Sequence, residues 1–347
     1  MIVLPDDVVL VTGATGFIGK YVVRGLLKRG VRRIRVFVRS TSDCSELTDI
    51  LRSHDGNIEI VRGSLLSPDD CAAASEHVSV IYHLAASRGT KAPSEAFLNT
   101  VVTTRNLLEA VRQHGCLKRF VAVSSFAVYS NADRSQSKIL DESAAVENRA
   151  HRRGDAYSFA KIKQEEIVRE YGRKYSIPYV IVRPGVVYGP GNEAITGRVG
   201  LGTFGLFLHL GGANAIPFSY VENCADAIVL AGLAQAVDGE VFNILDDDQI
   251  SSRQFLRLYK RNVRKFSSVY IPHAVSYLLC YLWEKYAQWS HDQLPGIYNR
   301  AVWRAYWKKA DYSNAKVKTR LGWQPKISAR EGLDLYFASC RRRQTIA

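Results

Sequence analysis

The sequence predicts a doubly wound α/β fold, in which helices cover both faces of a parallel sheet. Short apolar, β-branched runs alternate with helical segments over the first two-thirds of the 347 residues. A glycine-rich stretch, TGATGFIG at 12–19, follows the first of these runs. Residues 186–220 and 248–335 break the alternation; the first stretch is rich in glycine and the second in tyrosine and tryptophan. Strand–helix alternation with apolar strands is typical of a sheet that is buried on both faces.

Seven runs are predicted as strands of this sheet. They are Val8–Thr12, Ile34–Val38, Ile58–Val61, Val80–Leu84, Phe120–Ser124, Tyr179–Val182 and Val241–Ile244. Between most of them, apolar residues recur at spacings of three and four, as in TRNLLEAV at 104–111, which indicates amphipathic helices. Open parallel sheets bind their ligands at the carboxyl ends of the strands, where functional residues are therefore expected.

The glycine stretch predicts a site for the pyrophosphate of a dinucleotide. Gly13, Gly16 and Gly19 allow a sharp turn, a close approach of the backbone to phosphate, and tight packing of the next helix on the strand. That helix is expected to begin near Phe17 and to point its unpaired N–H groups at the phosphate. Thr15, Phe17 and Ile18 are therefore expected to contact the cofactor, and the sheet is predicted to be a Rossmann sheet.

The end of the second predicted strand bears on which dinucleotide is bound. Folds that prefer NAD place an acidic residue there, which accepts a hydrogen bond from the ribose 2′-hydroxyl. This chain has Arg39, followed by Ser40, and an arginine can hold a 2′-phosphate in a bidentate contact. We therefore expect NADP, with NAD as the alternative, because Arg39 could instead stack on adenine.

Three residues predict acid–base chemistry beside the cofactor. Tyr157 and Lys161 are four residues apart and share one face of a predicted helix. The ammonium of Lys161 and the positive nicotinamide ring are expected to lower the phenol pKa of Tyr157, which would then exchange a proton with a carbonyl or alcohol oxygen. Ser125, which follows the fifth predicted strand, would hold the same oxygen by a hydrogen bond.

The predicted organisation follows from these placements. We assign residues 1–185 to a dinucleotide-binding Rossmann domain, and residues 186–220 with 248–335 to a smaller, mainly helical substrate-binding lobe at the C-terminal edge of the sheet. Residues 221–247 return to the sheet, and residues 336–347, which include three consecutive arginines at 341–343, are expected to form a frayed tail.

Over nearly its whole length the chain resembles the extended short-chain dehydrogenase/reductase superfamily, the NAD-dependent epimerases and dehydratases. The matching stretches are TGATGFIG (12–19), YHLAA (82–86), VSSFAVY (123–129), YSFAK (157–161), RPGVVYGPG (183–191) and LGWQP (321–325). The resemblance implies that Ser125, Tyr157 and Lys161 are catalytic. It also implies cofactor contacts from Leu84, Ala85, Ala86, Pro184 and Val186, from Ser64 with Leu65 where the family often has Asp, and from Thr100 where the family has Asn, with Asn99 one residue early.

The resemblance leaves three functions open. Nucleotide-sugar enzymes of the superfamily carry an Asn before the Y-G-P turn and an Arg before the later Y-V segment, and both are missing here. FSYVENCADAIVLA at 218–231 is instead similar to the 3β-hydroxysteroid and sterol dehydrogenase branch. We therefore expect an NAD(P)-dependent oxidoreductase that interconverts a secondary alcohol and a ketone on an apolar, sterol- or lipid-like substrate. The alternatives are a nucleotide-sugar epimerase, dehydratase or reductase, in which Arg198 could replace the missing phosphate ligands, and a non-catalytic NADP-binding sensor or scaffold.

Charge and cysteine content limit the kinds of partner and the compartment that the sequence predicts. Forty-seven basic residues against 33 acidic ones give a formal net charge of +14, but no nucleic-acid-binding motif accompanies it, so no nucleic-acid partner is expected. Six scattered cysteines indicate buried thiols in a reducing, cytoplasmic setting, and no metal site is expected. Residues 272–289 predict either a helix lying in a membrane interface or a core helix of the lobe. A homodimer through the helices that carry 104–111 and 157–171 is a further expectation from the resemblance.

Overall fold

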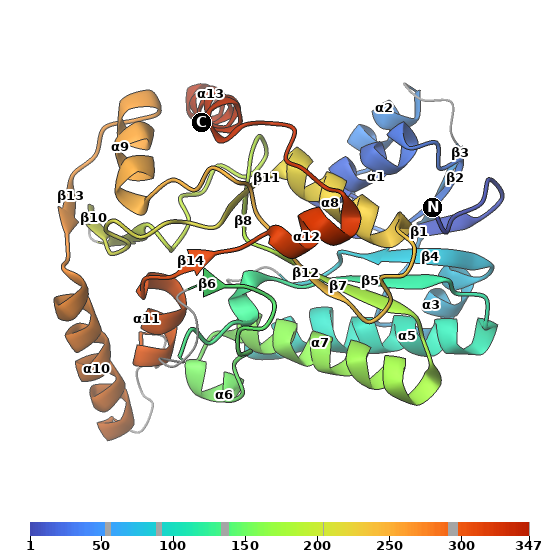
Figure 1. The fold of residues 1–347 in the computed structure, drawn as a ribbon, viewed down its shortest axis with the longest axis horizontal. Helices are drawn as coiled ribbons and strands as arrows, with labels where there is room; N and C mark the ends of the chain where they lie inside the picture. The colour runs from blue at the N-terminus through green and yellow to red at the C-terminus, as the bar shows by residue number, and fades with distance from the viewer. Residues whose placement is uncertain (53–56, 88–91, 133–138, 204, 291–297, 347) are drawn as a thin grey trace.

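The computed structural model describes residues 1–52, 57–87, 92–132, 139–203, 205–290 and 298–346. All seven predicted strands are present and form one parallel sheet in the order β12-β7-β5-β4-β1-β2-β3 (Figure 1). Their bounds are β1 Val8–Thr12, β2 Arg33–Val38, β3 Asn57–Arg62, β4 Val78–His83, β5 Arg119–Val123, β7 Tyr179–Pro184 and β12 Val241–Ile244. The chain order reverses between β1 and β4, which is the switch point where such sheets bind their ligands.

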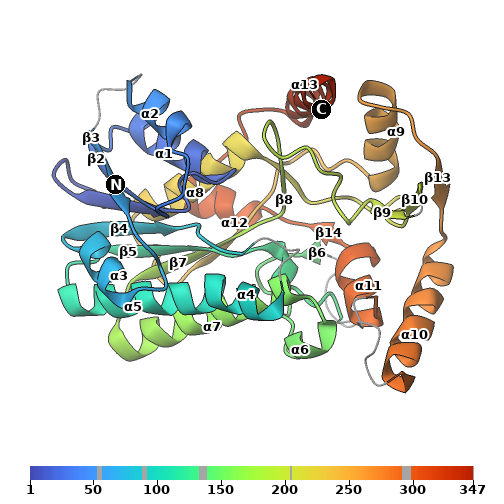
Figure 2. The same ribbon diagram turned by 180° about the vertical axis from the view of Figure 1, so that it is seen from behind.

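Helices cover both faces of the sheet, as predicted. α1 (Gly19–Lys28), α2 (Ser45–Arg52), α8 (Val221–Leu233) and α12 (Ala315–Leu321) lie on one face, and α3 (Pro68–Ser75), α5 (Thr103–His114) and α7 (Ala156–Tyr175) on the other (Figures 1 and 2). Strand β1 shows why its residues are apolar throughout. Val9 and Val11 belong to the first of the two cores and Val8 and Leu10 to the second, since successive strand residues point to opposite faces.

The region above the carboxyl ends of the strands contains more strand than expected. Residues 186–220 were assigned to a mainly helical lobe, but they form four short strands: β8 (Val186–Tyr188), β9 (Gly200–Thr203), β10 (Leu206–His209) and β11 (Phe218–Tyr220). β8 pairs with β11, and β10 pairs with both β9 and β13 (Ser268–Tyr270). The helices of this region are α9 (Ser252–Asn262), α10 (His273–Trp289) and α11 (Arg300–Trp307). The lobe therefore contains both helices and strands. Its short strands pair between segments far apart in the sequence, and this pairing gives their backbone N–H and C=O groups hydrogen-bond partners.

Smaller elements join these parts. They are α4 (Pro93–Phe97), a π-helical turn (Leu98–Val102), a 3₁₀ turn (Phe126–Val128), α6 (Ala150–Arg153), and the two-stranded pair β6 (Ile139–Leu140) with β14 (Asp311–Tyr312). No helix in the described ranges is long and apolar enough to cross a membrane.

The prediction that residues 336–347 form a frayed tail is wrong. Residues 329–346 form a single helix, α13 (Ala329–Ile346). Tyr336, Phe337 and Cys340 are buried, and the rings of Tyr336 and Phe337 pack against Phe255 and Tyr259 of α9. Burial of this aromatic face holds the helix on the lobe.

The cysteines also need one correction. None of the six is in a disulfide, and five are buried, but Cys116 is exposed in the turn after α5.

Candidate active site

The glycine loop lies against the loop that follows β4. Gly13 has φ +71°, and a Cβ there would come within 2.8 Å of the Ala85 nitrogen. A Cβ on Gly19 would lie 2.1 Å from the Gly13 carbonyl oxygen, so neither position accepts a side chain without a backbone shift. The Leu84 amide donates to the Thr12 carbonyl at 3.2 Å and joins the two loops. The predicted glycines and the predicted HLAA residues therefore meet at the switch point.

Helix α1 begins at Gly19, two residues later than expected. Phe17 and Ile18 pack against the aromatic core of the lobe, while Thr15 is exposed in the loop. The side chains of Phe17 and Ile18 thus fix the loop to the lobe. The glycines leave its backbone N–H groups free of side chains that would block phosphate.

The residues expected near adenosine lie at the carboxyl ends of β2 and β3. Arg39 is exposed immediately after β2, and the loop that it begins is held by Arg62, whose guanidinium donates to the Ser40 carbonyl at 2.8 Å. After β3, the Ser64 amide donates to Asp70 at 2.7 Å, and the Leu65 carbonyl accepts from Asn106 at 3.0 Å. Arg39, Ser64 and Leu65 thus follow neighbouring strands of the sheet.

Ser125 and Tyr157 meet directly. Ser125 caps the 3₁₀ turn after β5, where its hydroxyl accepts from the Ala127 amide at 3.1 Å, and it also hydrogen-bonds the Tyr157 phenol. Asp155 caps α7 by accepting from the Ser158 amide at 3.2 Å, which places Tyr157 in the first turn of that helix. Burial raises the pKa of Tyr157 to about 12, and the bond to Ser125 opposes this rise.

Lys161 is buried below Tyr157 on the same helix. Its ammonium donates to the Val123 carbonyl at 2.6 Å and to Gln164 Oε1 at 2.9 Å. Burial lowers the pKa of Lys161 to about 7, while the charge of Glu165 opposes that shift. The expected lowering of the Tyr157 pKa by Lys161 is not what the structure shows: burial dominates, and the groups that act on the phenol are Ser125, Tyr306 and Asp155.

A chain of buried hydrogen bonds connects Lys161 to the end of β1, and sequence reasoning missed it. Gln164 Nε2 donates to Thr104 Oγ1 at 3.0 Å, Thr104 Oγ1 lies 2.9 Å from His83 Nε2, and His83 Nδ1 lies 2.8 Å from Thr12 Oγ1. Burial, with the nearby charge of Lys161, lowers the pKa of His83 to about 3, so the imidazole is neutral. The spacing of Gln164, three residues after Lys161, was the available signal.

The donor and the acceptor of each of these hydrogen bonds can be assigned by starting from Thr104. The Thr104 hydroxyl donates to the Thr100 carbonyl at 2.5 Å, so Thr104 must accept from His83. His83 therefore carries its proton on Nε2 and accepts from the Thr12 hydroxyl at Nδ1. Lys161 and the start of the glycine loop are thus connected through one tautomer of His83.

Thr100 faces the loop after β4, and Asn99 does not. The Ser87 amide donates to Thr100 Oγ1 at 3.0 Å, whereas Asn99 donates to the Glu95 carbonyl of its own helix at 2.9 Å. Both residues lie in the π-helical turn, which contains one more residue than an α turn. Pro184 and Val186 lie at the junction of β7 and β8, at the same edge of the sheet.

Ser124, the neighbour of Ser125, belongs to the core. Its hydroxyl donates to Glu165 at 2.6 Å. Glu165 also accepts two bonds from Arg183, at 2.8 and 2.6 Å, and both side chains are almost fully buried. Burial alone would raise the pKa of Glu165, but Arg183 and Ser124 outweigh it and hold that pKa below its usual value.

Two arginines lie against the ring of Tyr306. The guanidinium of Arg198 lies 5.4 Å from the Tyr306 ring centre, and that of Arg153 lies 5.6 Å from it. Tyr306 is close enough to Tyr157 to act on its pKa. Arg153 donates to the Ala127 carbonyl at 2.6 Å, while Arg198 donates to the Tyr312 hydroxyl at 3.2 Å. Arg153 also pairs with Asp155 at 3.4 Å, which compensates its charge.

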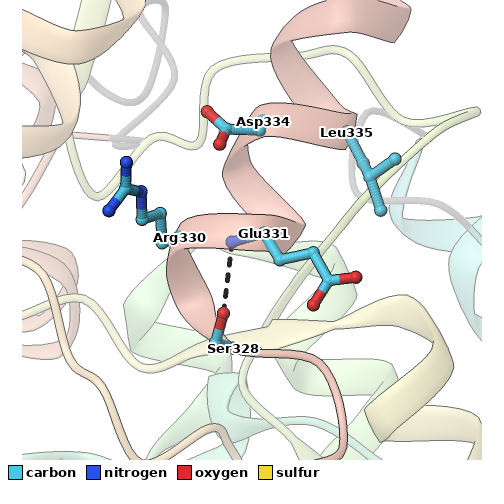
Figure 3. Close-up of a pocket in the computed structure, with 5 residues that line it drawn as sticks. All are labelled: Ser328, Arg330, Glu331, Asp334 and Leu335. Atoms are coloured by element: carbon cyan, nitrogen blue, oxygen red, sulfur yellow. Dashed lines mark hydrogen bonds between the residues drawn. The ribbon is translucent and has the colours of Figure 1, made fainter.

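Two hollows lie on other parts of the surface. One, of about 400 Å³, is at the start of α13 and is lined by Ser328, Arg330, Glu331, Asp334 and Leu335 (Figure 3). Ser328 there caps the helix by accepting from the Glu331 amide at 3.3 Å. The other, of about 620 Å³, lies between residues 193–195, the β9–β10 hairpin and α9. Neither contains Ser125, Tyr157 or Lys161.

Known proteins are similar to this chain over about two-thirds of its length. A trifunctional UDP-glucose 4,6-dehydratase/UDP-4-keto-6-deoxy-D-glucose 3,5-epimerase/UDP-4-keto-L-rhamnose-reductase of Arabidopsis thaliana is 30% identical over 68% of this chain, which spans only 36% of that enzyme. A 3 beta-hydroxysteroid dehydrogenase/Delta 5→4-isomerase of Mycobacterium tuberculosis is 28% identical, over 72% of this chain and 67% of the enzyme.

Solved structures share the fold over almost the whole chain. The protein gox2253 is 26% identical, with a TM-score of 0.79, over 97% of this chain and 99% of that one. UDP-glucuronic acid 4-epimerase from Bacillus cereus, in complex with NAD, has a TM-score of 0.71 at 22% identity, over 97% and 99% of the two chains.

The model of the NAD dependent epimerase/dehydratase family matches residues 9–244, from β1 to the end of β12. The chain therefore belongs to the NAD dependent epimerase/dehydratase family and is an enzyme of the extended short-chain dehydrogenase/reductase type.

Proposed function

We propose that this enzyme oxidises or reduces a secondary alcohol or ketone carbon of a nucleotide-linked sugar, in an epimerase, dehydratase or reductase reaction. The observation that carries the proposal is Arg198. Its guanidinium is half-buried against Tyr306, beside the catalytic tyrosine, and its one described side-chain hydrogen bond goes to a neutral hydroxyl. A planar cation of this kind suits the diphosphate of a sugar nucleotide.

The similar proteins favour the same substrate class over the sterol-like one. Relatives named for UDP- and dTDP-sugars include the Arabidopsis thaliana enzyme and the dTDP-D-glucose 4,6-dehydratase of Dictyostelium discoideum. The formal net charge of +14 also suits an anionic substrate. The missing Asn before Tyr188-Gly189-Pro190 is then compensated by cations of the lobe.

Three side chains would carry out the chemistry. Tyr157 is a protonated phenol at neutral pH, since its pKa lies near 12, and can donate its proton to a ketone oxygen. Ser125 bonds that phenol and orients the same oxygen. Lys161 acts from below, positioned by Val123 and Gln164. The glycine loop is folded as tightly as a dinucleotide loop requires, because a Cβ at Gly13 or Gly19 would clash with the backbone of Ala85 or Gly13, and the bound dinucleotide would supply or accept the hydride.

The cofactor is proposed separately, from Arg39. The family binds NAD, and no acidic residue stands at the end of β2, where Arg39 is exposed instead. A guanidinium in that place favours NADP through its 2′-phosphate. NADP favours net reduction with an exchanging cofactor over an epimerisation that retains it.

A second candidate keeps the sterol-like substrate of the sequence analysis. It is favoured by the Mycobacterium tuberculosis relative and by the stretch Val186-Val187, which lacks the Asn that nucleotide-sugar enzymes carry before the Y-G-P turn. A sensor without turnover is disfavoured, because Ser125 and Tyr157 are already in hydrogen-bonding contact.

A reciprocal pair of variants tests both proposals. Titrating UDP into Arg198→Met should show affinity reduced about 10- to 100-fold, the loss of a charge-assisted contact, with NADPH affinity unchanged. Arg39→Met should lower the preference for NADPH over NADH and leave UDP binding unchanged. Absence of UDP binding to the wild type at millimolar concentration would overturn the nucleotide-sugar proposal and direct the search to apolar alcohols. Near-stoichiometric NAD released on denaturing the purified protein would overturn the proposal for NADP.

A further inference from the structure

Helix α10 presents a large apolar surface to solvent. Six side chains at helical spacing form a stripe along its outer face, and about half or more of each is exposed: Val275 (47%), Leu278 (53%), Leu279 (54%), Leu282 (52%), Tyr286 (48%) and Trp289 (75%). A single exposed leucine is ordinary, but a continuous stripe of this length marks an interaction surface.

The side chains that the same helix buries are smaller than the leucines and aromatic residues that it exposes. Ser276, Cys280 and Ala287 are buried, and Ser276 accepts a hydrogen bond from Trp303 of α11 at 2.9 Å. Glu284 is tied to Arg300 by two bonds, at 3.0 and 3.1 Å. A helix that packs only against its own protein has the opposite arrangement, with its apolar face inward. We take α10 to have a second environment outside the protein.

Positive charge lies on α9, at the same end of the molecule as this stripe. Arg253, Arg257 and Arg261 are exposed at four-residue spacing along α9, and Arg264 and Lys265 are exposed after it. Residues 249–283 contain no Asp or Glu. The guanidinium of Arg253 lies 5.3 Å from the ring of Tyr270 in β13, the strand that leads into α10. Both views show α9, β13 and α10 along one end of the molecule, away from β1–β3 (Figures 1 and 2).

We propose that the face formed by the stripe of α10 and the arginines of α9 docks on an anionic lipid bilayer. The leucines enter the interface between headgroups and acyl chains, Tyr286 and Trp289 lie at the headgroup level, and the arginines meet the anionic headgroups. A second copy of this chain fits less well, because a symmetric contact would bring the basic α9 helices of two strongly cationic molecules together. This inference does not depend on the proposed substrate.

Flotation of the purified protein with vesicles tests the proposal. Wild type should float with vesicles of 30 mol% phosphatidylglycerol in phosphatidylcholine, and less with phosphatidylcholine alone. Leu278→Ser with Leu282→Ser should weaken binding to the anionic vesicles about fivefold per leucine, since about half of each side chain is exposed. Arg257→Gln with Arg261→Gln should weaken it about fivefold per cation, with little effect on binding to neutral vesicles.

Matched controls carry the same chemical changes elsewhere. Leu4→Ser with Leu66→Ser removes two exposed leucines, and Lys28→Gln with Arg32→Gln removes two exposed cations in the α1–β2 connection; neither pair should change flotation. Unchanged circular dichroism and cofactor binding show that the variants fold. The proposal is overturned if wild type stays unbound, or if the α10 and α9 variants bind like the controls. It is also overturned if light scattering shows a lipid-free dimer that the two leucine substitutions dissociate.

Discussion

Replacing Glu165 with Gln should lower the free energy of unfolding more than any surface substitution, because it leaves the buried charge of Arg183 without its anionic partner. The Arg183 guanidinium is 2% exposed and makes two bonds to Glu165, at 2.8 and 2.6 Å. Its other partner, the Tyr129 hydroxyl at 2.9 Å, is neutral. Removing one member of such a pair leaves the other charged, buried and only partly bonded, which destabilises a protein by about 3–5 kcal/mol.

The loss can be expressed as a melting temperature. With an unfolding entropy of about 2.1 cal/mol/K per residue, a chain of this length has about 0.7 kcal/mol/K, so the midpoint should fall by about 4–7 °C. Urea denaturation followed by tryptophan fluorescence measures the same quantity as a free energy. The loss should also deprive Lys161 of the charge that opposes its desolvation, which moves the pKa of Lys161 further below 7.

Arg169→Gln is the matched control. Arg169 lies 3.5 Å from the same carboxylate but is 39% exposed, so its loss should cost under about 1 kcal/mol. Ser124→Ala removes one charge-assisted bond and should fall between the two variants. A loss below about 1 kcal/mol for Glu165→Gln would refute the reasoning, because Arg183 would then have another way to compensate its charge.

Two further predictions concern buried polar groups. Thr104→Val should leave the His83 Nε2 proton and the Gln164 amide without their acceptor, lowering the free energy of unfolding by about 2–4 kcal/mol in urea denaturation, whereas Thr319→Val on the exposed face of α12 should not. Burial lowers the pKa of Lys161 from near 10 to about 7, so folding releases a proton in that window and stability without cofactor should rise from pH 7 to 10; Lys161→Met should flatten the rise in urea midpoints, and an unchanged slope would contradict the assignment.

The parts of the fold that the sequence predicted are those with one dominant local signal. Each strand of the main sheet is a short apolar run bounded by turns, and burial on both faces requires that pattern. The strands of the lobe lack it: β9 is GLGT, and β10 is completed by β13, some 60 residues further along the chain. Such pairings depend on tertiary contacts that a single sequence does not display.

The helix mistaken for a tail did carry a signal. Leu333, Tyr336, Phe337 and Cys340 recur at spacings of three and four, the pattern of a buried helical face. The three arginines that follow suggested fraying, but only the end of α13 is polar. The apolar spacing of residues 333–340 therefore predicts the helix, and the basic composition of residues 341–343 does not exclude it.

The site shows the same division. The spacing of Tyr157 and Lys161 and the glycine pattern could be found by reading along the chain. The bonds that fix Lys161 could not, because Gln164, Thr104, His83 and Thr12 come from α7, α5, β4 and β1. Gln164, Thr104 and Thr12 are neutral polar residues of common types, and nothing in the sequence marks them as members of a site. Only the fold, by placing α5 and α7 against the end of β4, makes them consecutive partners.

The two shifted pKa values describe the protonation of the site before a ligand binds. A phenol with a pKa near 12 holds its proton at neutral pH, and a lysine with a pKa near 7 is only partly charged there. Tyr157 is therefore an acid before anything binds, suited to protonating a ketone as it is reduced. To act as a base it must first lose that proton, which requires added positive charge nearby. Lys161 gains that charge most readily when its bonds to Val123 and Gln164 are kept, because both favour the ammonium. The groups that act on the Tyr157 phenol are Ser125, Tyr306 and Asp155, so the lysine contributes by its position, which the buried hydrogen bonds from Gln164 to Thr12 maintain.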